Sequence, residues 1–294
     1  MSSRVLNFPA QSVGRLYVDD SQVGKRFLCD ARLEVRLPDA GNVSLKLGAQ
    51  AVHDLSFFAG GKFDALVELE LPPVAISSKQ LEFVSKLSLL KRLKMSYSRV
   101  CDDAHQFVIG LKNLEELRVN WTELGDKTVA QISKLERLAV LDLSKTRVTD
   151  QGVQHLNHAR NLKILVLWDT KITGIGFAEL AGSALSEVWL SRSKVSDQNL
   201  SQVAKLTELR VLKLAETAVG DDGLAKLQTA SSLAELDLSD TRVTDDGIKY
   251  LSGMKSLRRL QMLNSGVSQS AVDELRQKRP GIDIAYSQRP RLTR

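Results

Sequence analysis

Histidine and cysteine side chains could ligate a metal, and this 294-residue chain has four histidines and two cysteines. His155 and His158 are three residues apart, which places both on one side of a predicted helix and suits a pair of metal ligands. Neither a cysteine nor a cluster of carboxylates accompanies them, although Asp150 begins the same predicted helix. We therefore interpret them as surface histidines, and we predict no metal site and no cofactor.

Nucleophilic and carboxylate catalysis are the other chemistries to consider. Cys101 follows Val100 at a helix-capping position where comparable segments have Thr or Ser, and no general base accompanies it, so we interpret it as a cap variant. Paired aspartates begin predicted helices, where their charge offsets the helix dipole: Asp102-Asp103, Asp221-Asp222 and Asp245-Asp246. We therefore predict no catalytic residues and a protein that is not an enzyme.

A leucine pattern, L-x-x-L-x-L, repeats along most of the chain and must position any site. Successive copies begin 24 residues apart, except for a step of 23 between Leu162 and Leu185. The copies begin at Leu66, Leu90, Leu114, Leu138, Leu162, Leu185, Leu209, Leu233 and Leu257. Glycines recur at one position of the repeat, which indicates architecture and not a phosphate-binding loop: Gly152, Gly176, Gly223 and Gly247.

One copy, Leu138–Gly152, indicates what each position does. Leu141 and Leu143 alternate with residues that face solvent, the period of a short strand with one buried face. Val148 then turns the chain inward, and Thr149-Asp150 favours a helix N-cap. The same pair of residue types recurs at Ser196-Asp197 and Thr244-Asp245. Apolar residues late in each copy predict a short helix, and because one unit cannot bury its own apolar face, stacking of units must stabilise the fold.

The full string, L-x-x-L-x-L-x-x-T-x-V-T-D-x-G-x-x-x-L, resembles the cysteine-containing subclass of leucine-rich repeats. It is similar to bacterial intracellular GALA-like proteins, with threonine in place of the subclass cysteine. That position reads Ser98, Thr122, Thr146, Thr170, Ser193, Thr217, Thr241 and Ser265, with Val74 in the first copy. A hydroxyl there can bond neighbouring backbone groups, so we interpret the series as a structural ladder.

The resemblance covers about residues 42–286 and implies an α/β leucine-rich-repeat solenoid. Such a solenoid is a curved arc with a parallel β-sheet on its concave face and short helices on its convex face. We find no F-box-like helical segment before the repeats, so a ubiquitin-ligase role is not implied. The resemblance does not name a partner, because one fold hosts many binding functions.

The ends of the chain depart from the repeat. Residues 1–41 contain alternating stretches at Arg15–Val18 and Arg32–Leu37 and are predicted to form a β-rich N-terminal cap; a small separate module is the alternative. Residues 42–65 are predicted to form a degenerate first repeat, with its helix at His53–Phe58.

The solenoid proper is predicted over residues 66–286, as about nine repeats closed by a strand at Gly281–Tyr286. Residues 287–294 form a basic tail that we expect to be mobile. The net charge is +6, and residues 276–294 carry six basic residues against Asp283, or +5, so the rest of the chain carries only +1. We therefore do not expect a nucleic-acid partner, although binding of nucleic acid or an acidic surface through the tail is an alternative.

Compartment and assembly follow from what the sequence lacks. The chain has no apolar run of about 18 residues, which argues against a membrane partner, and its start lacks the apolar stretch of a secretory signal. Cys29 and Cys101 do not resemble a disulfide framework. We expect a cytoplasmic monomer.

The tryptophans indicate where a partner would bind. All three, Trp121, Trp168 and Trp189, fall at positions that the strand pattern exposes on the concave face, and Tyr97 joins them, although aromatic residues form only 5% of the chain. The predicted partner-binding set also includes Arg118, Val140, Ile164, Val166, Arg192 and Lys213. Exposed apolar patches with Trp and Tyr are typical of interfaces, and a rim of both charges suits a protein or peptide. We predict such a partner, of unidentified sequence.

Other interpretations of these aromatic residues stay open. The cap, the tail or a sister chain could cover them, or the tryptophan rings could lie flat over the sheet. An enzyme regulator or inhibitor is a further possible function.

Overall fold

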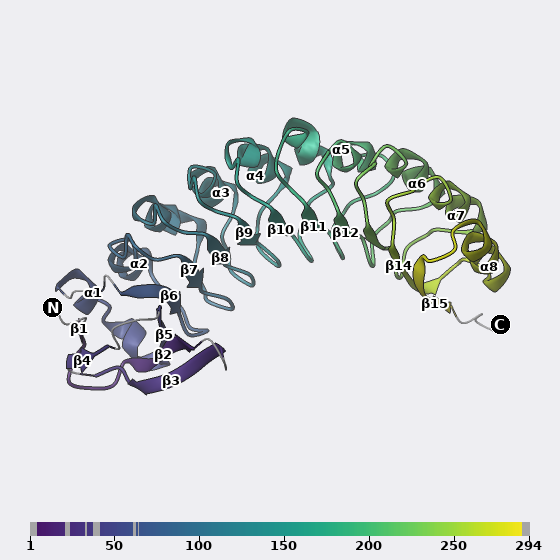
Figure 1. The fold of residues 1–294 in the computed structure, drawn as a ribbon. Coiled ribbons are helices and arrows are strands. Elements are labelled where there is room, and N and C mark those ends of the chain that lie inside the picture. Colours follow the sequence, from purple (N-terminus) through teal and green to yellow (C-terminus); the bar gives the residue numbers. More distant parts are fainter. Residues whose placement is uncertain are drawn as a thin grey trace, which may run out of the picture. The chain divides into compact units, whose positions relative to one another are not determined.

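The computed structural model describes residues 5–20, 24–32, 34–37, 42–60, 63 and 65–289. The chain forms two compact units, residues 1–142 (unit 1) and residues 143–294 (unit 2). In each unit, strands from consecutive repeats line one side and short helices line the other (Figure 1). The side of the strands that faces away from the helices is called the strand face of that unit.

Unit 1 contains a run of parallel strands in chain order. They are β5 (Val43–Leu47), β6 (Leu66–Glu70), β7 (Arg92–Lys94), β8 (Glu116–Arg118) and β9 (Val140–Asp142). The helices between them are η1 (Ala49–His53), α1 (Phe57–Gly60), α2 (Ser78–Val84), η2 (Asp102–Gly110) and α3 (Asp126–Ile132), where η denotes a 3₁₀-helix.

An antiparallel hairpin extends this sheet at the N-terminal side. Strand β2 (Gly14–Asp20) pairs with β3 (Gly24–Asp30) on one edge and with β5 on the other. Strands β1 (Val5–Asn7) and β4 (Glu34–Arg36) form a separate antiparallel pair. The strand face of unit 1 therefore includes side chains of the hairpin as well as those of the repeats.

A cluster of phenylalanines packs beside the first repeat. The rings of Phe8 and Phe63 meet edge to face at 5.6 Å, and those of Phe58 and Phe63 do so at 5.0 Å. All three side chains are buried, and Phe57 contacts each of them. Burying rings of this size contributes on the order of 2 kcal/mol each, so the cluster stabilises the N-terminal end of unit 1.

Unit 2 repeats the same arrangement. Its parallel strands are β10 (Ile164–Val166), β11 (Glu187–Trp189), β12 (Val211–Lys213), β13 (Glu235–Asp237), β14 (Arg259–Ser265) and β15 (Asp283–Gln288). Its helices are α4 (Asp150–His155), η3 (Leu156–His158), η4 (Ile175–Leu180), α5 (Leu200–Ala204), α6 (Asp221–Leu227), α7 (Asp245–Leu251) and α8 (Gln269–Lys278).

The core is built from the leucines of the repeat. The middle residues of successive strands are in register, as with Leu212, Leu236 and Leu260 in unit 2, and all three are fully buried. Their neighbours on each strand point to the strand face. The period-2 alternation predicted from the sequence is thus confirmed at the strands, and it fixes which side chains reach solvent.

The predicted hydroxyl ladder is present. The Oγ1 atoms of Thr146, Thr170 and Thr217 each donate to the carbonyl three residues earlier, at 2.6, 2.7 and 2.6 Å. These side chains are buried, so the bond satisfies a polar group that would otherwise be costly. The ladder is structural, as expected.

The aspartates at the helix starts bond differently from the prediction. Thr149 and Thr244 do cap their own helices, each accepting from the backbone N–H two residues later at 3.3 Å. Asp150, however, accepts from the backbone N–H groups of Thr173 and Gly174 in the next repeat, at 3.0 and 3.1 Å. The Thr-Asp pair in the sequence suggested that both residues cap the helix of their own repeat. In the structure, stacking of the repeats instead places the Asp150 carboxylate against the following repeat.

The first repeat and the C-terminal end also differ from expectation. The helix predicted at His53–Phe58 is interrupted, because the Asp54 carboxylate accepts from Ser56 N–H at 2.9 Å and closes a turn between η1 and α1. At the other end, Ser287 and Gln288 belong to β15, and Arg289 N–H donates to the Ser265 carbonyl at 2.8 Å. Residues 287–289, at the start of the tail predicted to be mobile, therefore pair with or bond β14, and residues 290–294 lie outside the described part.

Candidate binding face of the strands

Two aromatic side chains stack on the strand face of unit 1. The rings of Tyr97 and Trp121 lie 5.1 Å apart between centroids with their planes 24° from parallel. Tyr97 is 56% exposed and Trp121 is 41% exposed. The sequence pattern predicted that both side chains are exposed, and the structure shows that their rings stack as a pair.

The backbone explains why these side chains project. Tyr97 and Trp121 follow strands β7 and β8, and both have a left-handed backbone with φ of 60° and 62°. Tyr97 N–H donates to the Asn120 carbonyl of the next repeat at 2.9 Å, which holds the turn. The same left-handed position recurs in later repeats at Lys145, Asp169, Arg192, Glu216, Asp240 and Asn264. Because residues other than Gly, Asn and Asp seldom adopt this conformation, the leucine pattern gave no sign of it.

Unit 2 holds the other two tryptophans. Trp168 is half-buried, and its ring has Lys145 Nζ at 5.1 Å and Arg192 Cζ at 5.4 Å from its centroid. Trp189 is 39% exposed, and its indole N–H donates to Glu187 Oε1 at 2.6 Å. Trp168 is therefore held by cation–π contacts, while Trp189 presents its ring beside a carboxylate.

The remaining predicted binding residues lie on the strand faces, in several different settings. Val140 in unit 1, and Ile164 and Val166 in unit 2, are half-buried at strand positions. Arg118 pairs with Glu116 on its own strand at 2.5 Å. Lys213 forms an ion pair with Glu235 on the neighbouring strand. Since Trp121 belongs to unit 1 and Trp168 and Trp189 belong to unit 2, a single patch that includes all three stays a prediction.

Two further aromatic residues were missed from the sequence. Tyr17 on β2 and Phe27 on β3 meet edge to face at 5.8 Å, with 69° between their planes. Phe27 is exposed, and the pairing of Tyr17 with Ser44 places this pair on the strand face of unit 1. The alternation around Tyr17 predicted a strand, but nothing in the sequence indicated which repeat that strand pairs with.

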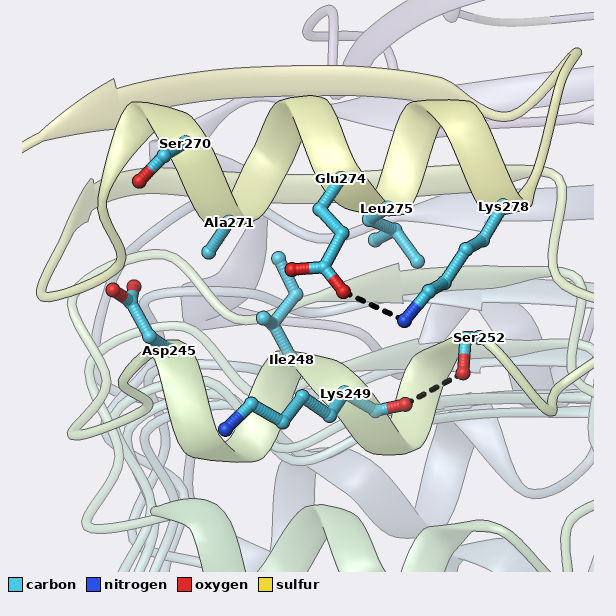
Figure 2. Close-up of a pocket in the computed structure, with 9 residues that line it drawn as sticks. All are labelled: Asp245, Ile248, Lys249, Ser252, Ser270, Ala271, Glu274, Leu275 and Lys278. Atoms are coloured by element: carbon cyan, nitrogen blue, oxygen red, sulfur yellow. Dashed lines mark hydrogen bonds and ion pairs between the residues drawn. The ribbon is translucent and has the colours of Figure 1, made fainter.

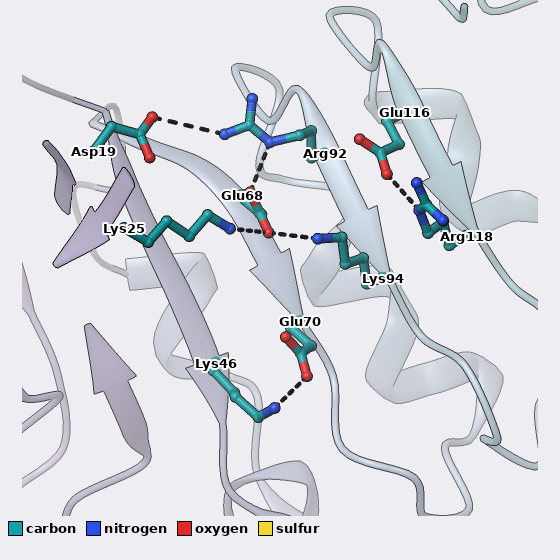
Figure 3. Close-up of polar contacts among 9 residues, drawn as sticks. All are labelled: Asp19, Lys25, Lys46, Glu68, Glu70, Arg92, Lys94, Glu116 and Arg118. Atoms are coloured by element: carbon teal, nitrogen blue, oxygen red, sulfur yellow. Dashed lines mark hydrogen bonds and ion pairs between the residues drawn. The ribbon is translucent and has the colours of Figure 1, made fainter. Parts of the chain in front are cut away.

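A block of charged side chains on the strand face of unit 1 centres on Glu68 (Figure 3). We call it the charged block, and its members are Asp19, Lys25, Lys46, Glu68, Glu70, Arg92, Lys94, Glu116 and Arg118. Its side chain is only 3% exposed, and it forms ion pairs with Lys25, with Arg92 Nε at 2.6 Å and with Lys94 Nζ at 3.0 Å. Burial opposes ionisation, but the hydrogen bonds from these three cations outweigh it and lower the Glu68 pKa from 4.5 to about 2. Glu68 is therefore ionised at neutral pH, and it links the hairpin to β7.

The histidine pair and Cys101, considered above as reactive groups, each have local contacts. The ring of His158 contacts the backbone of His155, with its Nδ1 3.3 Å from the His155 carbonyl oxygen. Cys101 occupies the N-cap of η2 without a side-chain capping bond, and its Sγ is 3.7 Å from Glu123 Oε2. Among the described residues, no group of three or more His, Cys, Asp or Glu side chains is arranged to hold a metal ion.

A hollow of about 280 Å³ lies between α7 and α8 on the helix side of unit 2 (Figure 2). The buried side chains of Ile248 and Leu275 form its apolar base. Glu274 Oε1 accepts from Lys278 Nζ at 2.6 Å, so these two lining charges are already paired. We assign this hollow no chemistry.

The stacked parallel strands and recurrent helices define a leucine-rich-repeat fold, as the sequence predicted. A family model described as Leucine Rich repeat matches residues 229–252, which is the length of one repeat. None of the curated protein sequences matches the chain. No helix in the described part of the chain is long and apolar enough to cross a bilayer.

Solved structures of two internalins from Listeria monocytogenes are similar to this chain. Internalin C2 is 24% identical, with 67% of this chain and 80% of that chain covered and a TM-score of 0.47. Internalin inlF is 16% identical, with 83% and 87% covered and a TM-score of 0.44.

Proposed function

We propose that the chain is a non-catalytic interaction module that binds a protein or peptide through its strand faces. The observation that carries this proposal is the exposure of the stacked Tyr97–Trp121 pair on a sheet whose leucines are buried. Large aromatic side chains with few rotatable bonds lose little entropy when a partner covers them, and they often dominate binding energy. In unit 2, the cation–π contacts of Lys145 and Arg192 hold the Trp168 ring in one conformation before binding.

Unit 2 supports the same proposal with Trp189. Its ring stands on the strand face, while its N–H is satisfied by Glu187. The half-buried Ile164 and Val166 lie on the adjacent strand β10, with Val166 in register with Trp189. A partner side chain that reached Trp189 would therefore also contact apolar surface.

Selection of peptides on the purified chain tests this function. A random peptide library displayed on phage should yield binders, and their dissociation constants can be measured by titration against Trp121→Ala, Trp189→Ala and the double variant. Loss of a buried aromatic anchor weakens binding by about 2 kcal/mol or roughly thirtyfold. Tyr250→Ala is the matched control, because Tyr250 is a comparably exposed aromatic residue on helix α7.

The expected result is weaker binding by the tryptophan variants, with circular dichroism and thermal melting unchanged. Undiminished binding by the double variant would overturn the proposal. A steady-state assay that shows turnover of a bound ligand would contradict its non-catalytic part.

We also infer that the repeats are of the cysteine-containing, GALA-like bacterial type, with threonine in place of cysteine. The buried threonines that bond their own repeat backbone support this inference. A cytoplasmic monomer is the accompanying proposal, and the exposed thiol of Cys101 suits a reducing compartment. Cell fractionation tests the location, and sedimentation tests the monomer.

A further inference from the structure

Most cations on the strand face of unit 1 are more exposed than the carboxylates that they pair with. The exception is Arg92, which is 26% exposed beside an Asp19 that is 36% exposed. Glu68 is 3% exposed, whereas Lys25 and Lys94, which both bond it, are 39% and 32% exposed. A lysine ammonium has three donors, so one bond to Glu68 leaves others for solvent. An approaching partner therefore meets the cations before it meets the buried carboxylate (Figure 3).

The next positions along the face continue this asymmetry. Lys46 is 56% exposed and pairs with Glu70, which is 39% exposed. Arg118 is 46% exposed and pairs with Glu116, which is 19% exposed. In each of these pairs the positive end is the more accessible, which makes the outer surface of the block basic although its formal charges nearly balance.

A hollow on the same face contains a buried hydroxyl that lacks a partner. The hollow has a volume of about 230 Å³, and its lining includes Tyr17, Ser44, the lysines Lys25 and Lys46, and the glutamates Glu68 and Glu70. Ser44 is 4% exposed, and its Oγ makes no hydrogen bond in the described part of the chain. An unsatisfied buried hydroxyl is unfavourable, because it has given up its hydrogen bonds to water without replacing them. A ligand oxygen beside it would remove that cost.

Aromatic pairs lie on the same face of unit 1 as this block. Tyr17 and Phe27 belong to the hairpin strands beside β5, and Tyr97 and Trp121 follow β7 and β8. Apolar side chains of a partner could rest on these rings while its charged groups reach the cations.

We propose that the strand face of unit 1 binds an acidic segment of a partner protein, with one carboxylate entering the hollow beside Ser44, Lys25 and Lys46. The inference rests on the proposed function and names the chemistry of its partner. The Ser44 hydroxyl donates to that carboxylate, and the two lysines supply charge-assisted donors. Apolar residues of the segment contact the aromatic pairs.

The arrangement suits carboxylates spaced along a peptide better than a nucleic-acid backbone. Glu70 is partly exposed within the charged block. Asp19 is a second partly exposed carboxylate there, with its Oδ2 3.8 Å from Arg92 Nη2. A polymer with a negative charge at every unit would meet these carboxylates in an unfavourable register, whereas a peptide can place polar or apolar residues there.

Fluorescence anisotropy with a labelled peptide of glutamates and phenylalanines tests the proposal on the full chain. The matched probe has glutamine in place of glutamate. The chain should bind the acidic peptide at least about tenfold more tightly than the glutamine peptide, and more weakly as salt is raised. Lys46→Glu with Arg118→Glu should abolish this preference, whereas Lys249→Glu with Lys278→Glu changes the net charge equally and should not.

Ser44→Ala provides a second variant that keeps the result interpretable. The substitution removes a hydroxyl without an intramolecular partner, so folding stability should not fall, while the affinity for the acidic peptide should fall roughly fivefold to tenfold. Equal affinity for both peptides, or no effect of the Lys46/Arg118 reversal, would overturn the proposal. Competition by a single-stranded oligonucleotide at the same site would do so as well.

The two proposals can fail separately. If the tryptophan variants lose the selected peptides while charge reversal on unit 1 has no effect, the interaction module stands and the acidic partner is wrong. If neither set of substitutions affects binding, the strand faces are not the binding surface.

Discussion

The carboxylate of Asp150 accepts a hydrogen bond from the backbone N–H of Gly176, 26 residues later in the chain, at 3.0 Å. The same carboxylate accepts from the hydroxyl and N–H of Thr173 and from the N–H of Gly174. It therefore satisfies free donors at the start of η4, where a negative charge is also favourable to the helix dipole. Asp102, Asp221 and Asp245 make equivalent contacts with the repeats that follow them.

Replacing Asp150 with Asn should destabilise unit 2. An amide has one acceptor oxygen and no charge, and its NH₂ group would face the N–H groups that Asp150 now binds. Loss of hydrogen bonds to a charged acceptor costs about 1.5–3 kcal/mol, which urea denaturation can measure. Asp246→Asn is the control, because Asp246 lies at the same kind of helix start but bonds the exposed Lys249. Equal losses in the two variants would contradict a link between repeats.

Gly176→Ala should also destabilise unit 2, for a steric reason. A Cβ atom at Gly176 would lie 2.5 Å from the Asp150 carbonyl oxygen and 2.9 Å from Val153 Cβ, and neither atom can move freely. Overpacking of this kind costs about 1–3 kcal/mol. Gly182→Ala is the matched control, since a Cβ there meets nothing within 4 Å. Thermal melts of the two variants should therefore separate, and a Gly176→Ala melt as high as that of Gly182→Ala would refute the steric explanation.

The sequence predicted the strand face well because one rule determines it. Leucines alternate with exposed residues within each strand, and the strands recur about every 24 residues. The two periods together determine which residues of each strand are buried, so Tyr97, Trp121 and Trp189 could be placed on the exposed side. The glycine at position 176 was recognised as architectural for the same reason. These inferences depend only on periodicity, and periodicity is visible in one chain.

Other features depend on contacts that periodicity does not encode. The ion pairs of Glu68 with Lys25 arise because the N-terminal hairpin pairs with β5, and no sequence pattern specified that pairing. The left-handed turns follow from the bonding of each turn to the next repeat, with residues as different as Tyr97 and Glu216 in the same conformation. Tertiary contacts override local preference at such positions.

Glu216 allows a direct test of the left-handed turn. Its φ is 54°, and its N–H donates to the Ser239 carbonyl at 2.9 Å. Glu216→Gly should be more stable than Glu216→Ala by about 1 kcal/mol, because only an L-side chain is strained there. At Glu208, which is exposed and lacks a positive φ, the order should be reversed or absent. Chemical denaturation of the four variants measures the difference, and the same order at both positions would be inconsistent with strain at Glu216.

Glu68 should make the stability of unit 1 depend on acidity. Its pKa in the folded chain is about 2, against 4.5 ordinarily, because Lys25, Arg92 and Lys94 hold it ionised. Because the Glu68 pKa is lower in the folded chain than in the unfolded chain, the ionised carboxylate stabilises the fold. This contribution is fully present above pH 4.5 and is lost as the pH falls through about 2. This pKa shift corresponds to roughly 3 kcal/mol of unfolding free energy, at 1.36 kcal/mol per pKa unit.

Glu68→Gln isolates that contribution. The variant should be less stable than the natural chain at neutral pH, since three cations lose their carboxylate, and the difference should shrink between about pH 5 and pH 2. Urea denaturation at a series of pH values gives both profiles, and Glu70→Gln serves as the exposed neighbour whose difference should stay small throughout. Parallel profiles for the natural chain and Glu68→Gln across this range would mean that the buried carboxylate is not held by the three cations in solution.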